Sequence, residues 1–205
     1  MRYFSAQPMH HRPPIQGLVS RRGVLATALA WPVAATRSAD DDAEPLLRAG
    51  GVVVGLRHAL APGTFDPPGF RLGDCATQRN LNEEGRSQAK RIGDWFARRG
   101  LRPARVRSSP WCRCLDTARL AFGGGQVWQA LGSPRGLPDI DPPARMRDLR
   151  EALAAASARR GRFEVWVTHG LVLSELAGSG SASGEGLVMR IEDGTLRVLA
   201  RLPAA

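Results

Sequence analysis

Between residues 51 and 201, short apolar runs alternate with longer stretches in which apolar residues recur at helical spacing. Short apolar runs between turn-forming residues predict strands, and an apolar residue at every third or fourth position predicts an amphipathic helix. The predicted strands are 51–57, 104–108, 126–131, 163–168, 187–192 and 195–201, with a hairpin turn at Asp193-Gly194 between the last two.

Four helices are predicted between these strands. The first begins after Asn82, a good N-cap, and ends near Gly100. The second helix starts near Pro110, the third spans 144–159 and the fourth spans 171–177. Because strands and helices alternate, we expect an α/β fold: a three-layer sandwich whose central sheet is mostly parallel and carries helices on both faces.

The segments outside this pattern are predicted to be irregular. Residues 40–48 are acidic and predict a flexible lead-in to the first strand. Residues 59–80 are rich in proline and glycine, and residues 132–143 contain four prolines. Long loops in a compact domain are usually binding loops or lids, so we expect these two loops to form the walls of a binding site.

Three polar clusters each follow a predicted strand. Arg57-His58 follows the first strand, residues 108–113 with Arg113 follow the second, and His169 follows the strand 163–168. In an open parallel sheet, ligands bind outside the carboxyl ends of the strands, where distant residues meet. The clusters therefore predict one pocket with two guanidinium groups and two imidazoles, which suits a phosphate group.

The motifs resemble those of the histidine phosphatase superfamily, the phosphoglycerate-mutase-like proteins. Arg57-His58 is followed by S-S-P-x-x-R-x-x-x-T-A from Ser108 and by Thr168-His169-Gly170. Residues 81–89 are similar to the family's L-[ST]-x-x-G-x-x-Q-A motif, with Asn82 in the Ser/Thr place. The resemblance covers roughly residues 50 to 190.

This resemblance implies a role for each clustered residue. His58 would attack phosphorus and become phosphohistidine, Arg57 and Arg113 would hold the phosphate, and His169 would stabilise the transferring group. No metal or cofactor is implied, because the arginines and the second histidine supply the positive charge. Arg107 is the rival to Arg113, but the motif places the arginine after S-S-P. Further phosphate hydrogen bonds are expected from Asn80 and Ser109.

Two departures from the family pattern concern the backbone and the general acid. Ala59 stands where the family has glycine. The family's L-x-E glutamate would fall in residues 131–133, which read Leu-Gly-Ser, and the other branch's acid would fall at Gly170 or Leu171. Glu151 follows the same letters but lies inside a predicted helix. Loop acids that could replace it are Asp66, Asp74, Asp139 and Asp141.

The expected function is hydrolysis of a small-molecule phosphate monoester through a phosphohistidine on His58. Without a general acid such an enzyme would favour good leaving groups, because general acid catalysis contributes roughly 100- to 10,000-fold. Two alternatives remain: a non-catalytic phosphate-binding module of the same fold, and a basic adaptor for acidic polymers. Mutase activity is not expected, because nothing marks a pocket that retains phosphoglycerate.

Composition is consistent with this function and excludes others. The 205 residues carry a formal charge of +10, which is typical of a soluble basic protein with scattered arginines; the alternative is a basic surface that attracts anionic substrates. We expect no nucleic-acid partner, because no Lys/Arg-rich run is interleaved with aromatic residues. The domain is expected to span residues 40–205, long enough for one substantial core.

The segment 1–39 resembles a targeting signal. Ser20-Arg21-Arg22 and Leu25 match most of the twin-arginine motif, and a largely apolar run, 26–35, follows. Cleavage after Ala35 or Ala39 would release a periplasmic or secreted protein. The apolar run is too short to span a bilayer of about 30 Å, so no stable membrane insertion is expected. An uncleaved anchor and a basic tail on a cytoplasmic protein are the alternatives.

Export would place the three cysteines in an oxidising compartment. Cys112 and Cys114 point to different faces of a helix and are not expected to pair. We expect Cys75 to pair with one of them, which would tie the long loop to the helix of Arg113; the alternative is three reduced thiols. The C-x-C spacing is not the usual one for zinc.

Overall fold

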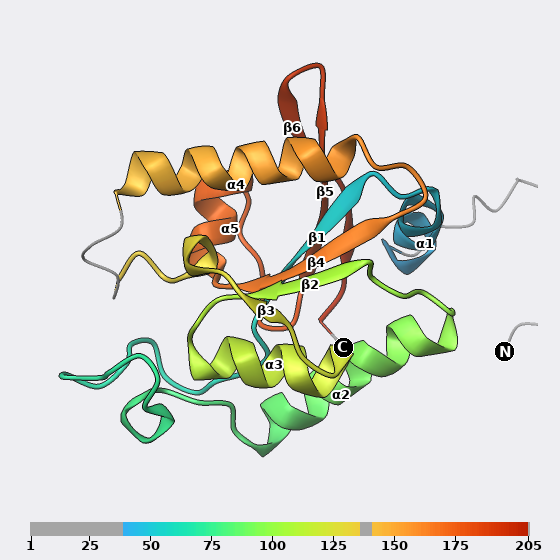
Figure 1. Ribbon diagram of the computed structural model, residues 1–205. Helices are drawn as coiled ribbons and strands as arrows, with labels where there is room; N and C mark the ends of the chain where they lie inside the picture. Colours follow the sequence, from blue (N-terminus) through green and yellow to red (C-terminus); the bar gives the residue numbers. More distant parts are fainter. Residues whose placement is uncertain (1–38, 136–140, 205) are drawn as a thin grey trace, which may run out of the picture. The chain divides into compact units, whose positions relative to one another are not determined.

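A computed structural model describes residues 39–135 and 141–204, which lie in the second of two compact units of the chain, 36–205. Its centre is a six-stranded sheet in the order β3-β2-β4-β1-β5-β6 (Figure 1). β1, β2, β3 and β4 are parallel, whereas β5 is antiparallel to both β1 and β6. The strands are β1 (Val52–Arg57), β2 (Arg105–Ser108), β3 (Gln126–Val127), β4 (Phe163–Thr168), β5 (Gly186–Glu192) and β6 (Thr195–Leu202).

Helices cover both faces of the sheet. α2 and α3 lie on one side in Figure 1, and α4 and α5 lie on the other. Buried side chains of α1 share the core cluster of α2 and α3, while α4 and α5 build a second cluster. The predicted three-layer sandwich is therefore confirmed. The helices are α1 (Ala39–Ala49), α2 (Glu83–Arg98), α3 (Cys112–Phe122), α4 (Pro142–Ser157) and α5 (Gly170–Ala177), with short 3₁₀ turns at Cys75–Thr77 and Gln129–Leu131.

Local chemistry sets the helix start nearest the long loop. The Asn82 side chain accepts a hydrogen bond from the backbone N–H of Gly85 at 2.8 Å, which satisfies a free donor of the first turn of α2. A Cβ built on Gly85 would lie 1.9 Å from the carbonyl oxygen of Leu60. Glycine at this position therefore lets α2 pack directly against the loop that follows β1.

The predicted final hairpin is confirmed. Asp193 and Gly194 both have positive φ, 50° and 74°, and they join β5 to β6. Such turns match the twist of paired strands and favour Asp-Gly.

Two predictions about the remaining segments were wrong. Residues 40–48 are not a flexible lead-in, because they form α1: Ala43 and Leu47, one turn apart, are buried in the core shared with α2 and α3. The predicted strand 126–131 is only two residues long, because Gln129–Leu131 form a 3₁₀ helix. This turn buries Ala130 and Leu131 in the core cluster that contains α4 and α5.

The predicted export signal, residues 1–39, lies outside the described residues except for Ala39. In the described ranges, no helix has the length and apolar character needed to cross a membrane.

Candidate active site

The strand register brings the polar clusters together. Arg57 at the end of β1 pairs with Thr168 at the end of β4, and Ser108 at the end of β2 pairs with Val167. The pairing continues past the strands: the N–H of His58 donates to the carbonyl of Thr168 at 2.9 Å, and the N–H of Ser109 donates to that of Val167 at 2.9 Å. The strands thus place His58 and the start of the S-S-P segment beside the end of β4, directly before His169.

A cavity of about 440 Å³ opens at this edge of the sheet. Four of the residues predicted for the site line it: Arg57, His58, Arg113 and His169. The long loop adds Asp66 and Arg79, the loop after the 3₁₀ turn Gln129–Leu131 adds Ser133, and α5 adds Gly170 and Leu171. The predicted involvement of both loops is consistent with these positions, although residues 136–140 of the second loop lie outside the described chain.

His58 is held as a neutral imidazole with one free nitrogen. Its Nδ1 lies 2.8 Å from the carbonyl oxygen of Ala59, so Nδ1 carries the proton and donates it, which leaves the lone pair on Nε2. Burial and, to a lesser extent, the positive charges of the nearby arginines lower the pKa of His58 to about 3, against the opposing effect of that hydrogen bond. A neutral imidazole with an available lone pair is a nucleophile at neutral pH.

His169 is the second neutral imidazole of the cavity. Its Nε2 lies 2.8 Å from Ser109 Oγ, and its ring lies 5.5 Å from that of His58. The Trp111 ring packs edge-on against it at 5.1 Å. Burial lowers the pKa of His169 well below its ordinary value, and His58 and the arginines lower it further. The hydroxyl of Ser109 is therefore used to orient His169, and Ser109 does not line the cavity.

Three arginines, Arg57, Arg79 and Arg113, surround the two imidazoles. Each has a buried Nε that finds no hydrogen-bond partner in the part of the chain that the structure describes. Their terminal nitrogens are anchored: Arg57 Nη1 donates to the carbonyl of Ser181 at 2.6 Å, and Arg79 Nη1 donates to that of Ala61. The three side chains thus face the cavity with fixed guanidinium groups, and an oxyanion suits such groups.

Arg79 was missed by the sequence analysis, which named its neighbour Asn80. The Asn80 side chain instead donates to the carbonyls of Cys75 and Gln78, at 2.6 and 3.1 Å, and does not line the cavity. A usable signal was the position of Arg79 two residues before Leu81, which is buried. A residue this close to a buried anchor is held near the protein interior.

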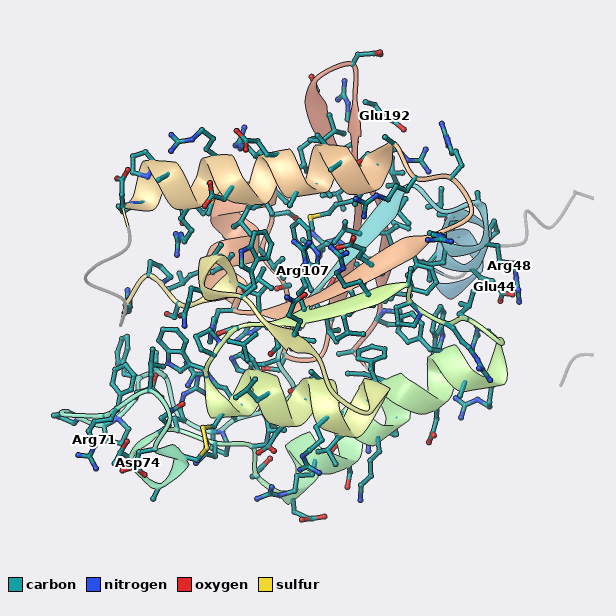
Figure 2. All side chains as sticks on the ribbon, in the orientation of Figure 1. Glu44, Arg48, Arg71, Asp74, Arg107 and Glu192 are labelled. Carbon is teal, nitrogen blue, oxygen red and sulfur yellow. A yellow bond between two sulfur atoms is a disulfide. The ribbon has the colours of Figure 1, made fainter. Side chains whose placement is uncertain are left out.

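The structure also separates the two rival arginines. Arg113 lies in the cavity, where its Nη1 and Nη2 donate to the carboxylate of Asp66 at 2.8 and 3.2 Å. Arg107 lies outside it, stacked over the Trp128 ring at 4.5 Å with Glu164 nearby. Figure 2 labels Arg107 near the middle of the sheet.

Asp66 is the candidate acid that the structure brings to the cavity. The other described candidates lie elsewhere: Asp74 pairs with Arg71, Asp141 caps α4, and Glu151 is exposed on α4. Asp139 lies outside the described residues. Ser133 lines the cavity at the place where the family motif would put its glutamate. Burial disfavours ionisation of Asp66, but hydrogen bonds from Arg113 and Arg79 outweigh it and hold the pKa of Asp66 below its ordinary value.

Ala59 is accommodated by the site. Among the described residues, Asp193 is the sole non-glycine with positive φ, so the backbone at Ala59 does not need glycine. Its methyl group packs in a small apolar cluster with Leu81 and Ala89. Its N–H donates to Thr117 Oγ1 at 3.0 Å, which joins the segment after His58 to α3.

A disulfide joins Cys75 to Cys112, so the prediction that Cys75 pairs with one of the two cysteines beside Arg113 is confirmed. In Figure 2 it is the yellow bond between α3 and the loop that carries the labelled Arg71 and Asp74. Cys114 is a buried free thiol 3.6 Å from His169 Nε2, and burial raises its pKa to about 12. Within residues 39–135 and 141–204, no group of three or more His, Cys, Asp or Glu side chains could hold a metal ion.

Solved structures share this fold. The open reading frame Rv3214 from Mycobacterium tuberculosis is 18% identical, with a TM-score of 0.54 over 73% of this chain and 96% of its own. Mycobacterial glucosyl-3-phosphoglycerate phosphatase Rv2419c is 18% identical, with a TM-score of 0.52 over 73% of this chain and 97% of its own. The protein histidine phosphatase SixA is 16% identical, with a TM-score of 0.50 over 74% and 96%.

At the level of sequence, no curated protein matches the chain. The family model that does match is that of the histidine phosphatase superfamily (branch 1), over residues 73–135. These residues include Arg79, the start of α2 and the S-S-P segment with Arg113. Together with the shared fold, this match confirms the resemblance of the chain to the histidine phosphatase superfamily.

Proposed function

We propose that this protein is a phosphatase that hydrolyses small phosphate monoesters through a phosphohistidine on His58. One observation carries the proposal: a single cavity is lined by two neutral histidines and by three arginines. The match to the phosphatase family model supports it. So do the names of two proteins of the same fold, Rv2419c and SixA, which are both called phosphatases.

The geometry suggests how the two chemical steps run. The Nε2 lone pair of His58 forms the bond to phosphorus while the bond to the ester oxygen breaks, and water then cleaves the phosphohistidine. Arg57, Arg79 and Arg113 neutralise the phosphoryl oxygens throughout, and guanidinium forks bind them better than ammonium does. Because these side chains supply the positive charge, we propose that the reaction needs no metal ion and that chelators leave the rate unchanged.

The test uses the full-length protein and p-nitrophenyl phosphate. His58→Ala should abolish turnover, whereas the control His10→Ala, outside the described residues, should retain it. Quenched wild-type enzyme should carry an acid-labile phosphoryl group that His58→Ala lacks. Tight binding of inorganic phosphate without turnover or phosphoenzyme would instead support the non-catalytic binding module.

We also propose that the protein is exported through its N-terminal twin arginines to the periplasm or the medium. The proposal rests on Arg21-Arg22 before the apolar run 26–35 and on the disulfide, a bond that persists in oxidising compartments. Replacing both arginines with lysine keeps the charge and should hold the protein in the cytoplasm, whereas Arg12→Lys should not. Cell fractionation measures this, and export of the double variant would contradict it.

A further inference from the structure

One carboxylate stands among the cations of the cavity. Within the described ranges, Asp66 is the single acidic residue that lines it. Its Oδ1 accepts hydrogen bonds from Arg113 Nη1 at 2.8 Å and from the Arg79 N–H at 3.0 Å. Its Oδ2 accepts from Trp111 Nε1 at 3.1 Å and from Arg113 Nη2 at 3.2 Å. The two oxygens of Asp66 thus occupy the fork of Arg113 as two phosphate oxygens would.

A bound phosphate must therefore compete with Asp66 for Arg113. Both terminal nitrogens of Arg113 already donate to the carboxylate, and Nη1 also donates to the carbonyl of Arg79 at 3.3 Å. Asp66 belongs to no helix or strand and its neighbours Phe65 and Pro67 are exposed, so the carboxylate can move without disturbing a regular element. Contacts with the bound phosphate must then offset the four hydrogen bonds that Asp66 gives up. After displacement from Arg113, the Asp66 carboxyl group would lie beside the bound phosphate.

We infer that the substrate's phosphate displaces the Asp66 carboxylate from Arg113, and that Asp66 then serves as the general acid. The inference rests on the proposed phosphatase function. As the His58 Nε2–phosphorus bond forms and the ester bond breaks, the Asp66 carboxyl proton moves to the leaving oxygen. In the second step the Asp66 carboxylate takes a proton from the attacking water, so the acid is restored when the phosphohistidine is cleaved.

Electrostatics favours this exchange. In the free protein, the hydrogen bonds from Arg113 and Arg79 keep the pKa of Asp66 low, so the group is ionised and paired. Losing Arg113 and gaining a phosphate dianion as a neighbour both favour the protonated form. Asp66 would thus acquire its proton only when a substrate is present.

The other polar groups of the cavity cannot take this role as readily. Ser133, Gly170 and Leu171 occupy the places where the family motifs put an acid, and none of these residues is acidic. His169 has a strongly lowered pKa, so it carries no extra proton at neutral pH.

The test compares two substrates and one ligand with the full-length protein. On O-phosphoserine, whose alkoxide is a poor leaving group, Asp66→Asn should lower kcat by roughly 100- to 10,000-fold. On p-nitrophenyl phosphate, whose leaving group needs little protonation, the loss should be below roughly tenfold. Inorganic phosphate should bind Asp66→Asn more tightly than wild type, because the competing carboxylate is gone. Asp66→Glu should keep the wild-type ratio between the two substrates.

Asp74→Asn, on the same loop and paired with Arg71, is the matched control and should change none of these quantities. Equal losses of kcat on both substrates, or an unchanged affinity of Asp66→Asn for phosphate, would overturn the proposed role. Asp66 would then only position Arg113. A wild-type protein that hydrolyses neither substrate and forms no phosphohistidine would overturn the phosphatase proposal itself. Tighter phosphate binding by Asp66→Asn would still show the competition.

Discussion

The disulfide between Cys75 and Cys112 joins the loop that carries Asp66 and Arg79 to the residue next to Arg113. A second link runs beside it, since the N–H of Cys112 donates to the Gln78 side chain at 3.0 Å. The cavity wall formed by a loop rich in proline and glycine is thereby fixed to a helix. Such a covalent link also limits how far the loop can move when Asp66 gives way to a ligand.

Reduction of this disulfide should destabilise the protein and weaken its anion site. The two cysteines are 37 positions apart, and closing a loop of that length contributes about 4 kcal/mol to the free energy of unfolding. Urea unfolding with and without dithiothreitol measures the difference, and the affinity for inorganic phosphate should fall in parallel. The variant Cys75→Ser/Cys112→Ser should match the reduced protein in stability and phosphate affinity, and dithiothreitol should change neither quantity. Unchanged phosphate affinity after reduction would show that the loop holds its place without the bond.

Arg79→Ala should weaken the binding of inorganic phosphate by roughly 10- to 100-fold, the effect of about 1.5–3 kcal/mol for a hydrogen bond to a charged group. Arg71→Ala removes the same charge from the same loop, but Arg71 is exposed and paired with Asp74. The affinity of this variant for inorganic phosphate should therefore stay near that of the wild type. Isothermal titration calorimetry of both variants separates a specific contact from general attraction. Equal losses in the two variants would indicate general attraction alone.

Stability should fall as the pH is lowered from 7.5 to 5. His58 and His169 have lowered pKa values in the folded protein, whereas an unfolded histidine has a pKa of about 6.5. The unfolded chain therefore binds more protons below about pH 6.5, and the loss should be about 2 kcal/mol for each histidine at pH 5. Asp66, whose pKa is lowered from 3.8, stays ionised across this range and adds nothing to the change.

Urea unfolding at the two pH values measures the difference. The variant His58→Asn/His169→Asn should show a much smaller dependence on pH. An equal dependence in variant and wild type would mean that other groups titrate.

The rim of the cavity should favour aryl phosphates. Phe65 is 63% exposed at the cavity, and the Arg135 guanidinium lies 4.9 Å from the centre of its ring. A substrate ring could pack on Phe65 while a second anionic group pairs with Arg135. Phe65→Ala should therefore raise KM for p-nitrophenyl phosphate severalfold and leave that for O-phosphoserine unchanged. A similar rise in KM for both substrates would indicate a shift of the whole loop. Leu60→Ala, outside the cavity lining, is the control and should leave both KM values unchanged.

The main features of the site follow from local patterns in the sequence. Arg57-His58 and His169 could be assigned to one edge because each directly follows an apolar run, and parallel strands end at a common edge. The choice of Arg113 over Arg107 came from its spacing after S-S-P, and the structure places Arg113 in the cavity. The roles of these residues in catalysis stay predictions.

Other features depend on tertiary contacts that local patterns indicate only weakly. Arg79 and Asp66 come from a loop without periodicity, and the disulfide and the pairing with Arg113 bring them to the cavity. The helix α1 was missed because its acidic stretch and Pro45 weigh against a helix, whereas burial of Ala43 and Leu47 stabilises it. Asn80 illustrates the converse: its side chain bonds to nearby carbonyls and so fixes the turn.

The buried thiol of Cys114 has a consequence for recovery of the protein after denaturation. In the folded chain its high pKa leaves almost no thiolate. Unfolding returns the pKa to about 8.5 and frees a nucleophile two positions from Cys112. Thiolates attack disulfides and exchange partners, so an alkaline, unfolded chain can form Cys75–Cys114 instead. Correct cysteine pairing is therefore preserved by the burial of the third thiol, and acidic conditions would preserve it during refolding.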